Sequence, residues 1–260
     1  MEKFINKIAR NLYDSRLDQL EDLIIVLPSK RAGTFFKQAL SDISDIPLWM
    51  PKIYSIEEWL EELSGYVIID RTQLLFEMYI SYQNVFSKEE QDSFEVFLKW
   101  APMLLTDFND IDSYLEQPQK LFDYLHQAKK IEVWKPFDGE TSEMVGNYIR
   151  FWELMGLLFL DYKKHLDEQN IAFQGMAYRK ASETIGRWID EKKPAKGTVC
   201  YIGFNAMNPC EEHIMRTLIA EDIAEAFWDA DTYYLNDKKQ EAGKYLRQHR
   251  RWPEFENRNF

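Results

Sequence analysis

Cysteine and histidine are scarce in this sequence. Its 260 residues contain two cysteines, Cys200 and Cys210, and four histidines. Two cysteines build no disulfide framework, and they fit the reducing environment of the cytoplasm, where we expect the protein to act. No histidine has the spacing of a zinc site with another histidine or with either cysteine. The sequence therefore predicts neither a metal centre nor a cofactor.

Long apolar runs and positive charge are also in short supply. No apolar run approaches about 18 residues, the length at which a segment becomes a candidate membrane span, so we expect no membrane association. Lys and Arg together number 32 against 44 for Asp and Glu, which gives a net charge of 32 − 44 = −12. A compact nucleic-acid-binding domain is usually basic, so this balance argues against one but allows a local basic groove.

Nucleotide-binding and hydrolase motifs are absent as well. No GxxxxGK[ST] string occurs, and the glycines and serines form neither a GxGxxG fingerprint nor a GxSxG elbow. The nearest candidate is residues 29–34, a loop after an apolar run, but Thr34 follows Gly33 where a Walker A loop has lysine. Three interpretations stay open for this loop: an ATP site, a plain strand-to-helix turn with solvated cations, and a contact for a phosphate backbone at a helix N-terminus.

What the sequence does contain is a pattern of short apolar runs separated by helical segments. Residues 198–235 read as strand, loop, helix and strand, the unit from which parallel sheets are built. An earlier β-branched run closed by Pro28 predicts a buried strand, and the two prolines within residues 47–53 predict an edge or irregular strand. Ser55 and Glu58 have the spacing of a capping box for the next helix. The predicted fold class is therefore α/β, with an incomplete parallel sheet of about four strands.

A large helical insertion separates the first strands from the later ones. From about Asp70 to Ile189 the apolar residues follow helical spacing, and the seam from Tyr148 to Leu166 predicts one helix of about 25 residues. We interpret the aromatic residues here as bundle core, with a stacking platform for bases as the alternative for the tryptophans. The prediction is thus an all-helical insertion between two parts of an α/β domain.

These patterns also place the domain boundaries. They predict a discontinuous α/β domain (residues 1–68 and 195–251), a helical insertion subdomain (69–194) and a tail (252–260). We expect the last eight residues to be unstructured. A sheet of so few strands suggests that the chain is the N-terminal part of a longer protein.

Ligands of open parallel sheets bind at the carboxyl ends of the strands. Here two such ends are residues 203–205 and 229–231, so a nucleotide or nucleic-acid site should border them. The first end offers no carboxylate for Mg²⁺. Asp229 and Asp231 could hold a metal, although two aspartates in a loop more often form turns and helix caps.

The densest positive charge lies near the end of the chain. Residues 236–250 are predicted as one basic helix, whose cations include Lys238, Lys239 and Arg247. The cations of such a helix are usually only solvated, and contact with the phosphates of a nucleic acid is the alternative.

The order of these elements resembles a known family. The strings are PSKRAG after a strand, PKIYSIEEWL, KWAPMLLTDFNDIDSYL in the insertion, VCYIGFNAMNPCEEHIMRTL and AEAFWDADTYYLNDKKQEAGKYLR. They resemble the N-terminal region of AddB/RexB-type helicase–nuclease subunits, in particular the version found in Bacteroidetes, whose C-terminal part carries a PD-(D/E)XK nuclease. The resemblance covers nearly the whole chain, and residues 104–115 and 201–218 are its most specific parts. Such proteins are similar in fold to superfamily I (UvrD-like) helicases, so a sheet of P-loop-NTPase type is implied.

The resemblance implies roles for particular residues. Residues 28–34 match a helicase motif that touches the single-strand backbone, which carries a DNA contact onto Ser29, Lys30, Arg31 and Thr34. A second strand-end motif near DNA falls on Tyr54 and Ser55. The Walker B position falls on Ile202, Gly203, Phe204 and Asn205, and a Gly-Asp-x-x-Gln sensor matches loosely at Asp229 and Thr232.

The departures from the family pattern imply that ATP hydrolysis has been lost. Ile202 and Gly203 replace the acidic pair, Thr232 replaces the sensor glutamine, and no Walker A loop or nuclease motif is present. The resemblance thus implies a catalytically inactive helicase-like module that contacts single-stranded or end-containing DNA in repair or recombination and positions it for a nuclease or partner helicase. Its expected partners are DNA, the helicase subunit of the same complex and the nuclease region of its own parent chain. The alternative is a protein–protein interaction scaffold that docks a partner helicase subunit without touching DNA.

Overall fold

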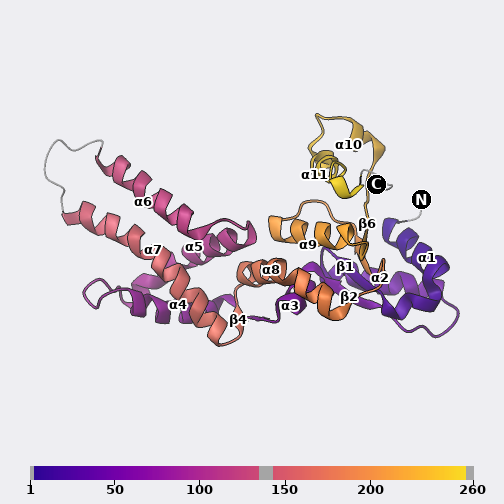
Figure 1. The fold of residues 1–260 in the computed structure, drawn as a ribbon, viewed down its shortest axis with the longest axis horizontal. Coiled ribbons are helices and arrows are strands. Elements are labelled where there is room, and N and C mark those ends of the chain that lie inside the picture. The colour runs from indigo at the N-terminus through magenta and orange to yellow at the C-terminus, as the bar shows by residue number, and fades with distance from the viewer. Residues whose placement is uncertain (1–2, 135–142, 256–260) are drawn as a thin grey trace. The chain divides into compact units, whose positions relative to one another are not determined.

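The computed structural model describes residues 3–134 and 143–255. Short strands alternate with helices at both ends of the chain, and long helices fill its middle (Figure 1). The strands are β1 (Ile24–Leu27), β2 (Lys52–Ser55), β3 (Val67–Ile68), β4 (Ile171–Ala172), β5 (Val199–Ile202) and β6 (Ala224–Phe227). The α-helices are α1 (Phe4–Arg16), α2 (Lys30–Ile43), α3 (Ile56–Ser64), α4 (Arg71–Val85), α5 (Phe94–Ser113), α6 (Pro118–Trp134), α7 (Glu143–Glu168), α8 (Gln174–Lys192), α9 (Pro209–Ala220), α10 (Thr232–Asn236) and α11 (Lys244–His249). Short 3₁₀ helices span Leu17–Asp22, Glu241–Gly243 and Pro253–Phe255.

The chain divides into two compact units. Unit 1 consists of Met1–Leu63 and Ala181–Phe260, and unit 2 is Ser64–Lys180. The boundary at which unit 2 ends and unit 1 resumes falls between Lys180 and Ala181, inside α8. The sequence pattern predicts this boundary after the helix, at residue 194. The reason lies in the packing: Ala177 belongs to the core of unit 2, while Trp188 packs edge-on against Trp59 of unit 1, with ring centroids 5.6 Å apart.

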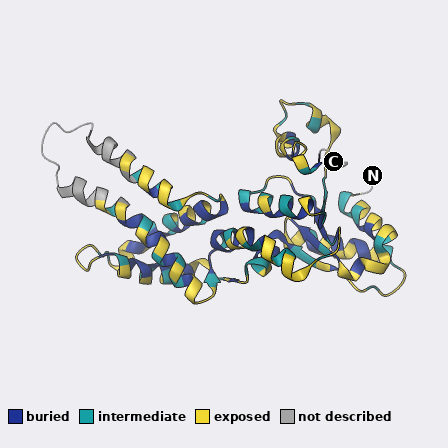
Figure 2. Ribbon diagram, viewed as in Figure 1, coloured by how far each residue is buried: buried dark blue, intermediate teal, exposed yellow. Residues whose placement is uncertain are grey.

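Unit 1 is built on a four-stranded parallel sheet of order β2-β1-β5-β6, which confirms the α/β class and the parallel sheet. The two central strands, β1 and β5, are almost wholly buried (Figure 2), which explains why their sequences are apolar without alternation. β2 lies at one edge of the sheet, as the two prolines predicted. It begins at Lys52, immediately after the second proline, because proline donates no hydrogen bond to a ladder.

Both faces of this sheet are covered. One face packs against α1 and α2 through a buried cluster that includes Leu12, Ile25, Leu27, Phe36 and Cys200. The side chain of Tyr201 points to the opposite face, because neighbouring residues of a strand alternate. There its hydroxyl accepts a hydrogen bond from Nε1 of the buried Trp59 at 3.2 Å, so α3 is fixed to the centre of the sheet.

Unit 2 is a helical bundle with an aromatic core. Met155, Phe159, Tyr162 and Leu166 of the predicted seam are at most 1% exposed, and the side chains of the seam's other two members lie outside the described residues. The prediction of an all-helical insertion over residues 69–194 is wrong in one detail: it contains β4, which pairs with β3, just before the insertion, in a two-stranded parallel sheet. Two-residue strands are too short to leave a period in the sequence. None of the described helices is both long and apolar enough to cross a membrane.

The prediction of one basic helix over residues 236–250 is wrong. α10 ends at Asn236, and α11 begins only at Lys244. Gly243 lies so close to the preceding turn that a Cβ there would stand 2.1 Å from the carbonyl oxygen of Tyr234. The guanidinium of Arg247 fills the gap by donating hydrogen bonds to three backbone carbonyls of the connecting loop. A folded turn therefore replaces the middle of the expected helix.

The expected tail is ordered at its start. Trp252 is 6% exposed, and its ring stacks on Phe255 with centroids 5.9 Å apart. Arg216 of α9 places its guanidinium 5.5 Å from the Trp252 ring and pairs with Glu254 at 3.1 Å. Residues 252–255 thus pack against α9 within unit 1, and the remaining five residues lie outside the described part of the chain.

Candidate functional site

All four strands of the unit 1 sheet are parallel, so their carboxyl ends form one edge. This carboxyl edge consists of residues 28–31, 55–58, 203–208 and 228–231. Because β5 pairs with β6, the structure brings residues 203–205 and 229–231 together, as parallel pairing predicts. The amide of Gly203 donates to the carbonyl oxygen of Phe227 at 2.9 Å.

The loop after β1 begins α2. Ser29 is the N-cap, and its hydroxyl accepts from the amide of Ala32 at 3.3 Å. Lys30, Arg31 and Thr34 are exposed. The ammonium of Lys30 lies 3.1 Å from a carboxylate oxygen of Glu58, on the helix that follows β2. Lys30, one of the two cations after β1, is therefore paired with a carboxylate of the neighbouring segment of the edge.

The end of β2 forms the capping box that its sequence predicts. Both the amide and the hydroxyl of Ser55 donate to Glu58 Oε2 at 2.9 Å, and the amide of Glu58 donates back to the hydroxyl at 3.3 Å. These bonds from Ser55, together with Lys30, hold the pKa of Glu58 below its usual value. Ser55 is 3% exposed, and the ring of Tyr54 packs on Trp59.

Buried apolar residues end β5, and an exposed polar residue follows them. Ile202 is 1% exposed, Gly203 turns the chain with φ of 75°, and Phe204 is buried edge-on against Tyr201. Asn205 is exposed. No carboxylate stands directly at this strand end, in agreement with the sequence.

A second capping box starts α9 just beyond this strand end. The side chain of Asn208 accepts from the amide of Glu211, and the Glu211 carboxylate accepts from the amide of Asn208, each at 3.0 Å. Burial is the main reason that the pKa of Glu211 lies above its usual value, and the nearby charge of Glu57 adds to it. The carboxylate is thus already bound to the backbone amide of Asn208 at the helix N-terminus.

The end of β6 carries exposed acidic residues. Asp231 is the N-cap of α10 and accepts from the amide of Tyr233 at 2.7 Å, and Thr232 is the first residue of that helix. Asp229 is exposed. Within the described residues no group of three or more His, Cys, Asp or Glu side chains is placed to hold a metal ion. The observed role of Asp231 is the turn-and-cap role that sequence reasoning weighed against a metal site.

The carboxyl edge therefore presents helix N-termini that already have acceptors. Free amides at a helix N-terminus bind phosphate and other anions. Here backbone amides of α2, α3, α9 and α10 donate to the side chains of Ser29, Ser55, Asn208 and Asp231. The amides of Ser55 and Asn208 donate in turn to the carboxylates of Glu58 and Glu211. A nucleotide phosphate that used these same amides would have to displace the protein's own oxygen atoms.

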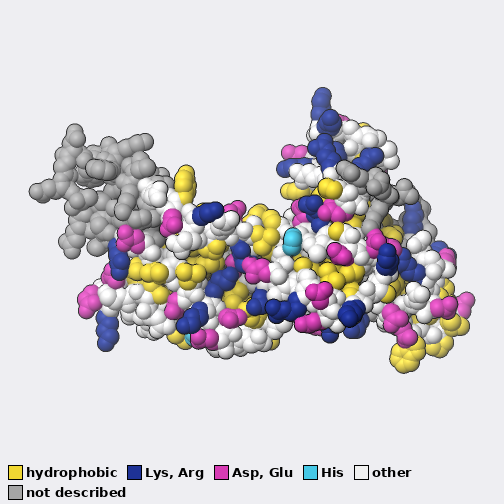
Figure 3. All heavy atoms as spheres, viewed as in Figure 1, with side chains coloured by type: hydrophobic (Ala, Val, Ile, Leu, Met, Phe, Trp, Pro, Cys, Tyr) yellow, Lys and Arg dark blue, Asp and Glu magenta, His cyan; other side chains and the backbone are white. Residues whose placement is uncertain are grey.

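The second candidate region is residues 232–251, here called the C-terminal basic segment. It contains six Lys and Arg residues and two acidic residues, which gives 6 − 2 = +4 on a chain of net charge −12. Figure 3 shows Lys and Arg side chains over α10 and α11. Tyr233, Tyr234 and Tyr245 of the same segment are 61%, 42% and 38% exposed. Lys238 and Lys239 are exposed, whereas Arg247 is partly buried and engaged with backbone carbonyls.

Sequence reasoning missed an aromatic cluster around His249. The imidazole is 3% exposed and lies between the rings of Trp228 and Trp252, 5.0 and 4.6 Å away. Burial lowers its pKa to about 4, so the ring is neutral at pH 7. The sequence gives little sign of this cluster, because Trp228 follows β6 while His249 and Trp252 lie 21 and 24 residues later.

Both cysteines are structural. Cys200 and Cys210 are fully buried, and burial raises the pKa of the Cys200 thiol to about 12. A thiol with such a pKa is not a nucleophile near neutral pH.

Comparison of the sequence with models of known protein families and with curated proteins finds no match.

Proposed function

We propose that this chain is a catalytically inactive helicase-like module that holds single-stranded DNA for a nuclease or a partner helicase. The observation that carries the proposal is the C-terminal basic segment, where cations and tyrosines are exposed together. Single-strand binders combine positive charge along the backbone with aromatic rings on which bases stack. The parallel sheet and the helical insertion after β2 are compatible with a helicase-like domain but are shared by many folds.

The geometry of the segment supports both kinds of contact. Lys238, Lys239 and Arg250 are exposed and free to approach phosphates, and Tyr233 and Tyr234 are exposed beside them. Arg247 has the different task of holding the loop that presents these residues. Of the three cations predicted from the sequence, we therefore assign direct phosphate contact to the two lysines and a positioning role to Arg247.

The side chains at the carboxyl edge support the second part of the proposal, that the module does not hydrolyse ATP. Hydrolysis by helicases needs a carboxylate at the strand end that holds Mg²⁺, and here the strand end is Gly203 and Phe204. The carboxylates nearby, Glu58 and Glu211, accept hydrogen bonds from the backbone amides of Ser55 and Asn208, the residues just before their own helices. We infer that the carboxyl edge keeps the backbone arrangement of a nucleotide site but lacks the residues that hydrolyse ATP.

The test is fluorescence anisotropy with a labelled oligothymidylate at low and high salt. Removing one cation that binds a phosphate should reduce the slope of log K against log salt by about 0.7 on a single strand, because fewer counterions are released. The triple change Lys238→Ala, Lys239→Ala and Arg250→Ala should therefore flatten the slope by about 2 and weaken binding at least tenfold at low salt. Changing Tyr233→Ser should cost about 1–3 kcal/mol, because a base can no longer stack on the ring.

The matched control removes the same charge elsewhere. Lys88, Lys99 and Lys120 are exposed lysines of unit 2, and the triple alanine variant should bind DNA as the unchanged chain does. Equal losses in both triple variants would mean that only net charge matters, and no binding at low salt would favour the interaction scaffold instead. ATP turnover that Asp229→Asn abolishes would refute the inactive module.

A further inference from the structure

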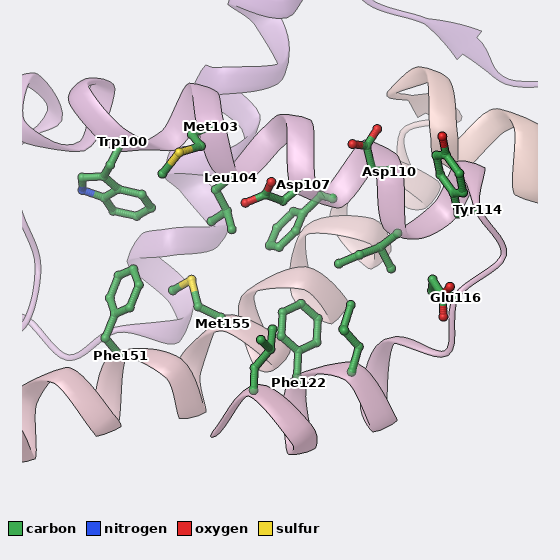
Figure 4. A pocket seen from close by; sticks show the side chains of 14 residues that line it. Trp100, Met103, Leu104, Asp107, Asp110, Tyr114, Glu116, Phe122, Phe151 and Met155 are labelled. Atoms are coloured by element: carbon green, nitrogen blue, oxygen red, sulfur yellow. The ribbon is translucent and has the colours of Figure 1, made fainter. Parts of the chain in front are cut away.

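Unit 2 contains an apolar groove that the proposed DNA contact does not use. Its volume is about 560 Å³, and it lies between α5 on one side and α6 and α7 on the other (Figure 4). Its walls include Phe108, Phe122 and Met155, which are 0%, 7% and 1% exposed because the bundle core holds them. The groove is therefore a preformed depression with fixed walls.

The groove is elongated. One face of α5 lines it from Trp100 onward, Tyr114 follows directly after that helix, and Figure 4 shows these two rings at opposite ends of the groove. Fourteen residues of helix extend about 21 Å, the length of about four turns. A trough of this length between helices matches the apolar face of another helix, which anchors side chains at i, i+3 or i+4, and i+7.

Apolar side chains remain exposed along this trough. Met103 is 69% exposed and Tyr114 57% exposed, although both line the groove. Water contact with side chains of this size is unfavourable, and a covering apolar surface would remove it. Methionine adapts its shape readily and is common where a protein binds helical partners.

The charge of the groove is of one sign. Asp107 and Asp110 of α5 line it, Glu116 lies beyond the end of that helix, and none of the lining residues that the structure describes is basic. Burial raises the pKa of Asp107, and the neighbouring Asp110 raises it further. No ion pair of the described residues involves these three carboxylates. A ligand that brings positive charge would relieve this repulsion.

We propose that the groove binds an amphipathic helix of a partner protein, with Leu-like side chains on one face and Lys or Arg along its border. The apolar walls select the helix face, and the three carboxylates select the basic border. The proposal is independent of DNA binding, because it uses neither the C-terminal basic segment nor the carboxyl edge.

The test uses two labelled synthetic peptides of about 16 residues, long enough to cover the four turns of the groove. Both carry leucine at i, i+3, i+4 and i+7, and they differ only in lysine or glutamate at the bordering positions. The full chain should bind the lysine peptide with micromolar affinity in anisotropy measurements and the glutamate peptide at least tenfold more weakly. Met103→Gln, which removes an apolar contact without adding charge, should weaken binding of the lysine peptide at least tenfold. Asp107→Asn with Asp110→Asn should weaken it severalfold and flatten its salt dependence.

The control variant is Leu160→Gln, which changes an α7 side chain that is 52% exposed and does not line the groove. It should bind the lysine peptide as the unchanged chain does, with circular dichroism confirming that every variant is folded. Equal binding of both peptides, or unchanged binding by Met103→Gln, would overturn the proposal. So would a folded chain that binds neither peptide, or a dimer that Met103→Gln weakens, since the occupant would then be a second copy. The Lys238, Lys239 and Arg250 variant should keep its peptide binding whatever happens to DNA.

Discussion

Asp112 is a fully buried carboxylate that joins three helices of unit 2. It lies near the end of α5, with Lys163 of α7 at 2.7 Å from one oxygen atom and Arg179 of α8 at 2.6 Å from the other. The side chains of the two cations are only 23% and 15% exposed. Removing the carboxylate would therefore leave two positive charges that water reaches poorly.

The magnitude follows from that burial. Breaking a buried ion pair by removing one partner costs about 3–5 kcal/mol, out of a total stability of about 5–15 kcal/mol. We expect Asp112→Ala to lose about this amount. Asp112→Asn keeps a carbonyl acceptor and the shape of the side chain, so its loss should be smaller, about 1–3 kcal/mol.

Urea denaturation followed by circular dichroism measures the loss, and hydrogen exchange locates it. Amides of α5 and α7 should exchange faster in Asp112→Ala, while those of β1 and β5 stay as they are. Adding Lys163→Met to Asp112→Ala should restore part of the stability, because it removes one of the unpaired cations. A loss below about 1 kcal/mol, or no rescue by the second change, would refute the reasoning, because it would mean that Lys163 and Arg179 reach water once the carboxylate is gone.

Two further predictions concern buried groups of unit 1. Tyr201→Phe should destabilise the chain by about 1–3 kcal/mol in urea denaturation, because it leaves the buried indole N–H of Trp59 without its acceptor. His249 has a folded pKa of about 4 against about 6.5 unfolded, so protons bind the unfolded chain more tightly. Its contribution to stability is present above about pH 6.5 and is lost as pH falls toward 4. The urea midpoint should drop between pH 7.5 and pH 5 by more in the unchanged chain than in His249→Phe, and equal drops would contradict this assignment.

Much of the unit 1 fold could be predicted because its central strands are buried on both faces. Such strands must be apolar throughout, so β1 and β5 stand out from the polar segments around them. The two prolines place β2 too early in the sequence, since they mark where the strand begins and not where it pairs. The turn at Gly243 escaped prediction because the close approach that requires glycine involves Tyr234, nine residues earlier in the sequence. Helical propensity carries no information about such a contact.

In the candidate sites too, features set by spacing along the chain could be predicted, and features set by contacts between distant segments could not. The capping box of Ser55 and Glu58 follows from a spacing of three residues, and the sequence was sufficient to find it. The pairing of Lys30 with Glu58 depends on β1 lying beside β2, which spacing along the chain does not reveal. The groove of unit 2 depends on three helices meeting, and its lining residues are the same apolar types that fill the core.

The pairing of Lys30 with Glu58 gives a way to decide whether the carboxyl edge contacts DNA. Glu58→Gln removes the partner charge, while glutamine preserves the capping box, so α3 should keep its start. If DNA passes the edge, the released Lys30 should strengthen single-strand binding and steepen its salt dependence by about 0.7. If DNA contacts only the C-terminal basic segment, affinity should change no more than in Glu89→Gln, an exposed acid of unit 2. We expect the second result, because the edge carboxylates would repel a phosphate that the basic segment attracts.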